Sequence, residues 1–309
     1  MNLNSSTQIN LYEHKEILKH LFKLYKNDRL PNKFLLSGEK GIGKSTLAYH
    51  LINLILSENE EYPYDLENCN IKIDNKSFKL IQNKSNPNFN LIDVIDDKKN
   101  IDINQIRDLI TNLNKSSFNN KKRFILIDNI ELLNINSINA LLKIIEEPNE
   151  NICFILINNN KKVLSTLKSR CLNFKVFLSK NQSIRIVNQL LKDDINNFIN
   201  NELLDNYITP GRLLKLYNFS KNYNIDFVNS NLIETLKTLI RDKIYKRDKT
   251  INEIIYSFIE LFFRNNVSIK NINLIKSYRY FLEKIYNTKI YNLDEETLFM
   301  EFEDKILNG

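Results

Sequence analysis

Apolar residues recur at two spacings in the first half of the chain, and the two spacings alternate. Short, mostly apolar runs, of the kind that form buried strands, occupy residues 34–37, 123–127 and 152–157. Apolar residues at helical spacing mark residues 13–27, 45–56, 103–113, 137–147 and 161–169. Strands that alternate with helices in this way predict an α/β fold, a mostly parallel sheet with helices on both faces.

The rest of the chain is less regular. Residues 172–177 alternate like a strand near a sheet edge, whereas residues 57–100 are polar and interrupted by prolines, so we place no element there. After Ser179 the spacing stays helical, with Pro210-Gly211 as the clearest break. Since 309 residues exceed one average domain, we expect two or three domains.

The composition is that of a soluble protein, with 42% apolar and 26% charged residues. No apolar run reaches the roughly 18 residues that a membrane helix needs, and the start, MNLNSSTQINLYEHK, lacks an apolar signal core. We therefore expect a cytoplasmic protein without a membrane span. Cys69, Cys153 and Cys171 lie far apart, which argues against disulfides and structural zinc. The net charge of +7 permits contact with nucleic acid, but the Asn, Ile and Lys usage of an AT-rich genome explains it equally well.

Residues 38–46 read GEKGIGKST and fit the phosphate-loop pattern of Gly, four residues and Gly-Lys-[Ser/Thr]. Such glycines let successive backbone N–H groups turn toward an anion at the start of a helix. An apolar run before the loop and a helical run after it give the required order, although a Gly-rich segment can also be a simple turn. The pattern predicts a nucleotide site in which Lys44 reaches the β- and γ-phosphates and the Ser45 hydroxyl joins a Mg²⁺ shell. The predicted binding residues are Gly38, Gly41, Gly43, Lys44, Ser45 and Thr46.

Three further strings carry a family resemblance. Residues 125–128 read ILID, residues 139–148 read NALLKIIEEP, and residues 169–171 read SRC. In this order they resemble the motif set of bacterial clamp-loader subunits, AAA+ proteins that open the replicative sliding clamp and place it on DNA. Within that family the chain is most similar to the delta-prime subunits of the DNA polymerase III holoenzyme. Supporting strings are Arg29-Leu30-Pro31 and Pro210-Gly211-Arg212-Leu213-Leu214, and clear similarity covers roughly residues 10–216.

The resemblance implies an AAA+ phosphate-loop domain over residues 1–178, a helical lid over residues 179–222 and a C-terminal helical domain over residues 223–309 that packs into an oligomeric collar. It implies ATP or ADP with Mg²⁺ as cofactor, and no zinc. The implied partners are the gamma/tau and delta subunits, the sliding clamp and primer-template DNA, with no membrane. Motor subunits of this family commonly carry Asp-Glu at the metal-binding strand and a four-cysteine zinc module. This chain has Asp128-Asn129 there, and Cys69 alone between the two nucleotide motifs.

The resemblance assigns a metal-binding role to Asp128, whose carboxylate would hold Mg²⁺ beyond the end of a buried strand. An Asp that merely begins a turn is the alternative. Asn129 occupies the place of the usual catalytic Glu, and a neutral amide cannot accept a proton from an attacking water. Glu131 is a conceivable substitute, but two residues further on we expect it to point elsewhere, as a solvated turn residue. Nucleotide binding is therefore expected, whereas hydrolysis is doubtful.

Two polar positions resemble the sensors of the family. Asn158, at the end of the next strand, resembles the side chain that contacts the γ-phosphate, but Asn159 and Asn160 are adjacent alternatives and all three can be loop residues. Arg212 lies where a second sensor, from the lid, could meet the nucleotide.

Arg170 of the Ser-Arg-Cys string is the implied catalytic residue. In this family that arginine does not serve its own nucleotide but reaches the site of an adjacent subunit, as an arginine finger. A guanidinium on the γ-phosphate stabilises transition-state charge and contributes about 10³–10⁵ in rate. A surface salt bridge is the alternative explanation.

These inferences predict a stator, a fixed clamp-loader subunit that supplies Arg170 in trans and hydrolyses little or no ATP itself. The main alternative is a working ATPase of the gamma/tau motor type. An unrelated phosphate-loop kinase is a weaker one, since it would not explain the Ser-Arg-Cys and Glu-Glu-Pro strings.

Overall fold

The computed structural model describes residues 4–95, 98, 100–113, 121–146, 151–204, 208–247, 250–267, 272–291 and 293–308. The chain forms two compact units. The first unit contains residues 1–186 and 209–212, and the second contains residues 187–208 and 213–309. The three-domain division at residues 178 and 222 stays a prediction.

The first unit is built on a five-stranded sheet in the order β2-β3-β4-β1-β5, and every pairing is parallel. The strands are β1 (Lys33–Ser37), β2 (Phe89–Ile92), β3 (Arg123–Ile127), β4 (Ile152–Asn158) and β5 (Leu172–Lys175). All residues of β4 are buried, as expected for a central strand covered on both faces. The register pairs Ser37 with Asn158, so the carboxyl ends of β1 and β4 meet at one edge.

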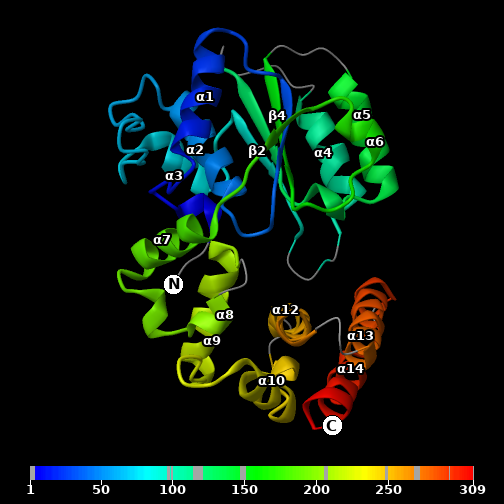
Figure 1. The fold of residues 1–309 in the computed structure, drawn as a ribbon. Coiled ribbons are helices and arrows are strands. Elements are labelled where there is room, and N and C mark those ends of the chain that lie inside the picture. The colour runs from blue at the N-terminus through cyan, green and yellow to red at the C-terminus, as the bar shows by residue number, and fades with distance from the viewer. Residues whose placement is uncertain are drawn as a thin grey trace. The chain divides into compact units, whose positions relative to one another are not determined.

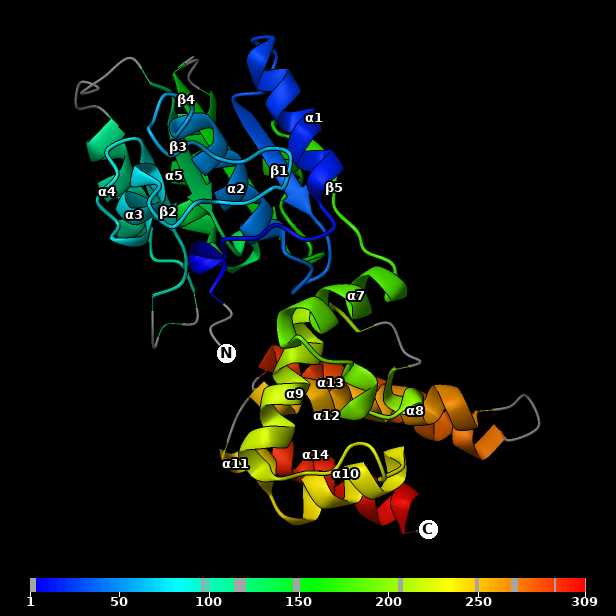
Figure 2. The same cartoon turned by 90° about the vertical axis from the view of Figure 1, so that its left-hand side faces the viewer.

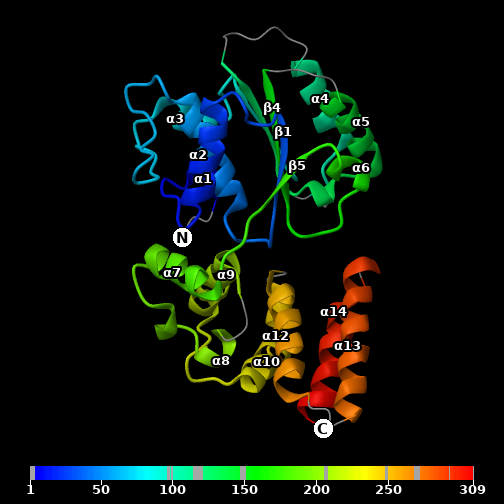
Figure 3. The same cartoon turned by 45° about the horizontal axis from the view of Figure 1, so that its top comes forward.

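Helices cover both faces of this sheet. One face carries α1 (Lys15–Lys26), α2 (Lys44–Leu56) and α3 (Lys76–Gln82), and the other carries α4 (Ile103–Leu113), α5 (Ile135–Glu146) and α6 (Ser165–Lys168) (Figures 1 and 3). Leu109 and Leu141 pack with strand residues such as Ile125 in one buried cluster. The predicted α/β fold is confirmed.

The structure differs from the sequence prediction in three places. Within residues 57–100, where no element was placed, the chain forms α3 and the edge strand β2. The helix expected over 161–169 is limited to α6. Pro210-Gly211 begins a helix instead of breaking one, because proline lacks only an N–H that the first helical turn leaves unpaired. Residues 147–150, including the end of the Glu-Glu-Pro string, lie outside the described residues.

In its described residues the second unit is largely helical, as predicted for the C-terminal region. Its helices include α8 (Asn201–Leu204), α10 (Leu232–Arg241), α11 (Ile244–Arg247), α12 (Thr250–Asn266), α13 (Ile272–Tyr291) and α14 (Glu295–Phe302) (Figure 2). Two helices, α7 (Lys180–Leu191) and α9 (Pro210–Tyr223), have residues in both units. Phe263, Phe281 and Phe302 pack against one another in the core, with ring centroids 5.2–6.0 Å apart. No helix in the described part of the chain is long and apolar enough to cross a membrane.

Candidate nucleotide-binding site

The phosphate loop joins β1 to α2 in the predicted order of strand, loop and helix. Gly41 and Gly43 both have φ = 90°, a left-handed conformation that a side chain would strain. At Gly38 a Cβ atom would lie 2.2 Å from the carbonyl oxygen of Val176, so only glycine fits. Because α2 begins at Lys44, the N–H groups of Lys44, Ser45 and Thr46 belong to the first turn, where a helix leaves them unpaired.

Lys44 is buried against the loop that precedes it. Its ammonium donates hydrogen bonds to the carbonyl oxygens of Gly38 (2.9 Å) and Glu39 (2.6 Å). Burial lowers the pKa of Lys44 to about 8, while the charges of Asp128 and Glu131 oppose that change. At neutral pH the side chain therefore remains mostly protonated, as a phosphate ligand must be.

Ser45 and Asp128 meet directly. The Ser45 hydroxyl donates to Oδ2 of Asp128 at 2.5 Å, although the two residues come from α2 and from the end of β3. Burial raises the pKa of Asp128, while the bond from Ser45 opposes that rise. A hydroxyl and a carboxylate side by side are oxygen ligands of the kind that Mg²⁺ takes beside phosphates. The donor set thus fits the magnesium ion that the phosphate loop implies.

Glu131 lies in a turn, as expected, but its carboxylate is bonded to Asn159 and does not extend freely into solvent. Asn129 has φ = 54°, and this left-handed residue turns the chain into a 3-10 helix at Ile130–Leu132. That turn brings the Glu131 carboxylate to Asn159, which donates to it from its side-chain amide (2.8 Å) and its backbone N–H (3.4 Å). Asparagine adopts the left-handed conformation more readily than most residues, which explains why the turn occurs here.

The structure also distinguishes Asn158 from Asn159 among the three adjacent sensor candidates. The Asn158 side chain is bonded to the backbone of Lys161, donating to its carbonyl and accepting from its N–H, both at 3.2 Å. The Asn159 side chain instead joins Asn129 to Glu131. Asn159 is therefore the asparagine whose amide belongs to the polar network beside Asp128, whereas Asn158 contributes its main-chain oxygen to Gly38 N–H (3.2 Å).

The start of α9 packs on the phosphate loop, a contact that the sequence did not indicate. The Thr209 hydroxyl donates to the carbonyl of Lys40, and the Gly211 N–H donates to the carbonyl of Gly41, both at 2.9 Å. A Cβ atom on Gly211 would lie 2.8 Å from the Gly41 Cα, so the two backbones touch. Arg212 follows directly and is exposed beside the loop.

His14 is a second contact that the sequence did not predict. Its Nε2 lies 2.6 Å from the carbonyl oxygen of Ile42, and the ring is buried beside Gly43. Burial lowers the pKa of His14, so the neutral imidazole is favoured. The loop is thus supported by residues from the N-terminal segment and from α9, at sequence distances that no local motif could reveal.

Arg170 lies apart from these residues. Its guanidinium forms an ion pair with Glu146 (2.7 Å) and donates to the carbonyl of Thr166 (2.8 Å), and its side chain is 37% exposed. Neither partner belongs to the phosphate loop or to the strand ends around it. Because Glu146 belongs to the NALLKIIEEP string, the ion pair links the two strings on which the family resemblance mainly rests.

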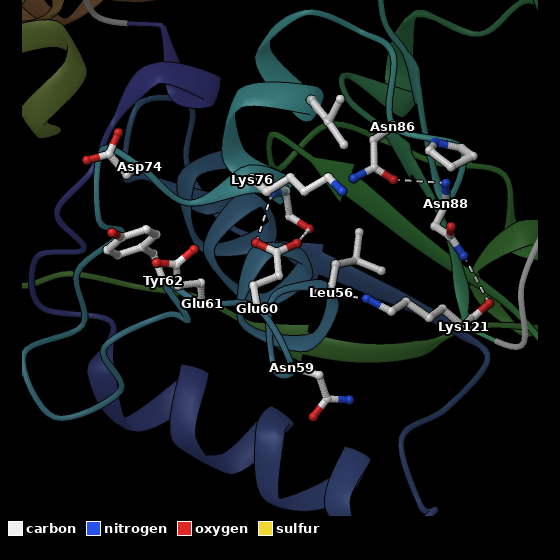
Figure 4. Close-up of a pocket in the computed structure, with 13 residues that line it drawn as sticks. Leu56, Asn59, Glu60, Glu61, Tyr62, Asp74, Lys76, Asn86, Asn88 and Lys121 are labelled. Atoms are coloured by element: carbon white, nitrogen blue, oxygen red, sulfur yellow. Dashed lines mark hydrogen bonds between the residues drawn. The ribbon is translucent and has the colours of Figure 1, made fainter.

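A cavity of about 530 Å³ lies elsewhere in the first unit, near the residues that precede β2 and β3 (Figure 4). Several of its polar groups bond to protein atoms. The Glu60 carboxylate accepts from the Ser77 N–H (3.1 Å) and hydroxyl (2.6 Å), and the Lys121 ammonium donates to the Leu56 carbonyl (3.0 Å). None of the residues predicted to bind nucleotide lines this cavity.

Comparison with known proteins agrees with the motifs. Residues 13–179 match the family model described as DNA polymerase III, delta subunit. A DNA polymerase III subunit delta′ of Buchnera aphidicola is 25% identical over 285 residues, which cover 89% of this chain and 84% of that protein. The subunit delta′ of Pseudomonas aeruginosa is 30% identical over 139 residues, 45% of this chain and 40% of that one.

Relatives that are named as gamma subunits are also similar. A DNA polymerase III subunit gamma of Buchnera aphidicola is 30% identical over 186 residues, covering 60% of this chain and 49% of that protein. A gamma subunit-related protein of Thermotoga maritima has a solved structure with a TM-score of 0.46 and 18% identity, over 91% of this chain and 96% of that one. The superposition is too distant to bear on function. The match to the family model spans more than half of the chain, which therefore belongs to the DNA polymerase III delta-subunit family and is delta-prime-like within it.

Proposed function

We propose that this chain is a clamp-loader subunit that lends Arg170 to the nucleotide site of an adjacent gamma/tau subunit. The observation that carries the proposal is the position of Arg170, half-exposed and outside its own phosphate loop. A guanidinium is permanently charged and donates in a planar fork, which suits a triphosphate presented by a neighbour. The subunit acts as a stator of the complex that loads the sliding clamp onto primer-template DNA in the cytoplasm.

The chain's own site is proposed to hold ATP or ADP with Mg²⁺. Support comes from the converging phosphate-loop glycines, Lys44 and the Ser45–Asp128 pair. Thr46 lies in the same first turn, and Arg212 stands beside the loop as the second sensor. Asn159, rather than Asn158, is the sensor of the terminal phosphate in this proposal, because its side chain belongs to the site's polar network. Asn129 has no proton-accepting group, so Asn129 itself cannot act as the base for hydrolysis at this site.

The second unit is proposed to supply the collar that joins the subunits. On α13, Ile275, Leu282, Tyr286 and Ile290 are 36–63% exposed and recur at helical spacing, so they form one apolar stripe. We refer to these four residues as the α13 stripe. The proposed binding partners of this stripe are the helical domains of the delta and gamma/tau subunits.

Arg170→Ala tests the proposal in the loader reconstituted with its native partners. We expect the DNA-stimulated ATPase rate of the complex to fall by about 10³-fold or more, because the motor site loses a transition-state cation. Lys168→Ala is the matched control, since Lys168 is an exposed cation two residues away. Unchanged activity of the Arg170 variant in an intact complex would contradict the trans role.

A gamma/tau-like motor is the second candidate function. The position of Glu131 favours it, because a carboxylate does lie in the site despite the Asn at position 129. Turnover by the isolated chain distinguishes the two: rapid hydrolysis that Lys44→Ala abolishes would indicate a motor.

A further inference from the structure

The carboxylate of Glu131 is held at the carboxyl edge of the sheet. Both of its oxygens accept hydrogen bonds from Asn159, the residue that follows β4. Strand β4 is paired with β1, and β1 leads into the phosphate loop. The negative charge of Glu131 acts on the ammonium of Lys44, where it opposes the fall in pKa that burial causes. Its contacts with Asn159 place Glu131 at the edge of the sheet where β1 leads into the phosphate loop.

Asn129 cannot take the role that its position in the motif suggests. Its amide N–H₂ donates to Oδ1 of Asp93, at the end of β2, and its amide oxygen accepts from the Asn159 side chain, both at 2.8 Å. Both ends of the side chain are thus used to connect the ends of β2 and β4. Asn129 is a bridge, and the left-handed turn at its backbone places Glu131 in the site.

We infer that Glu131 is the general base of a slow nucleoside triphosphatase activity of this chain, positioned for that role by Asn159. This activity goes beyond the lending of Arg170 and does not depend on it. In the step, a water oxygen bonds to the terminal phosphorus while the bond from that phosphorus to the bridging oxygen breaks. The bridging oxygen keeps the electron pair and leaves with the nucleoside diphosphate, and the proton lost by the water passes to the Glu131 carboxylate and then to solvent.

The chain's residues divide the remaining tasks. Lys44 and the backbone N–H groups of the loop bind the phosphates, and Ser45 with Asp128 would hold the magnesium ion, which supplies charge neutralisation when bound. Asn159 donates one amide hydrogen to Glu131 and the other to Asn129, which fixes the carboxylate against rotation. A base positioned in this way contributes typically about 10²–10⁴ in rate.

Glu131→Gln tests this inference on the isolated full-length chain. Glutamine keeps an oxygen that accepts from Asn159 but cannot take up a proton, so the contact survives while the base is lost. We expect hydrolysis of Mg-ATP to fall by about 10²-fold or more. Binding of a fluorescent non-hydrolysable ATP analogue should stay within about twofold of wild type, because ground-state binding is untouched.

The identity of the retained nucleotide is an independent readout. After incubation with Mg-ATP and rapid gel filtration, the wild-type chain should carry mainly ADP and the Glu131→Gln chain mainly ATP. Glu61→Gln, an exposed carboxylate in a different part of the first unit, is the control and should behave as wild type.

Two results would overturn the inference. One is wild-type hydrolysis no faster than that of Lys44→Ala, and the other is a Glu131→Gln rate equal to wild type. Neither result touches the proposed stator role, which is tested in the reconstituted complex through Arg170. Conversely, if Arg170→Ala left the ATPase rate of the complex unchanged, the hydrolysis rate of the isolated Glu131→Gln chain would still test the inference.

Discussion

A single buried histidine illustrates how individual residues control the stability of the nucleotide unit. His50 lies in α2 and is fully buried, with Nδ1 2.8 Å from the Tyr64 hydroxyl and Nε2 3.2 Å from the carbonyl of Gln8. Burial lowers the pKa of His50 to about 4. Between pH 6.5 and 4 the unfolded chain therefore binds a proton that the folded chain does not, so stability falls as pH falls through this window.

We predict that His50→Gln flattens this acid dependence. Between pH 7 and pH 5 the protonation of His50 in the unfolded chain lowers the free energy of unfolding by about 2 kcal/mol. The fall in unfolding free energy over this range should therefore be about 2 kcal/mol smaller for His50→Gln than for wild type. Urea unfolding at the two pH values measures the difference. His20→Gln, an exposed histidine on α1, should keep the wild-type dependence. Parallel pH curves for wild type and His50→Gln would show that His50 is not the group responsible.

The directions in which single side chains point were the least predictable feature of the site. The direction of the Glu131 side chain depends on one positive φ angle, at Asn129. Whether Asn158 or Asn159 joins the polar network depends on where β4 ends. The pattern of apolar residues predicts neither the φ angle nor the exact end of the strand. The order of strand, loop and helix around the glycines and Ser45 could be predicted, because a phosphate loop is a continuous segment with its own sequence pattern.

At the scale of elements, the start of α9 acts as part of the phosphate loop. Gly211 is the residue that permits this, since its backbone lies against Gly41 and donates to the Gly41 carbonyl. In an ordinary helix, alanine is more favourable than glycine by about 1 kcal/mol. At position 211 glycine should be more favourable than alanine, because an added methyl group meets backbone atoms of Gly41 that cannot rotate away.

We predict that Gly211→Ala destabilises the protein by about 1–3 kcal/mol and weakens nucleotide binding, as overpacking moves the loop. Chemical denaturation and titration with a fluorescent ATP analogue measure the two effects. Lys215→Ala, an exposed position on the same helix, should change stability by less than about 0.5 kcal/mol. A Gly211 variant as stable as the Lys215 control would mean that the two backbones separate easily.

Most elements could be predicted, and the exceptions share a cause. The core strands β1, β3 and β4 each contain an unbroken run of three or more apolar residues, which makes them visible in sequence. The edge strand β2 contains an Asn within four residues, so it resembles a polar loop until its pairing with β3 is known. The bond between Thr209 and Lys40 joins residues 169 positions apart, and only the folded chain brings them together.

At the scale of the whole molecule, the α13 stripe is the surface through which we expect the chain to join its complex. We predict that Tyr286→Asp prevents co-elution with delta and gamma/tau subunits in gel filtration, because a charge would be buried in an apolar interface. Its thermal midpoint should stay near wild type, since the side chain is 63% exposed in the isolated chain. Asn273→Asp, exposed on the opposite side of α13, is the control and should still assemble. Normal assembly of the Tyr286 variant would place the collar contact elsewhere.

The ion pair between Arg170 and Glu146 bears on how subunits communicate. An exposed pair of this kind is worth only about 0–1 kcal/mol. In the proposed trans role, a neighbour's triphosphate, with several negative charges, would therefore compete for the guanidinium at little energetic penalty. A diphosphate offers less charge and competes less well. The resting position of one arginine would then report, across a protein–protein boundary, how many phosphates the adjacent nucleotide still carries.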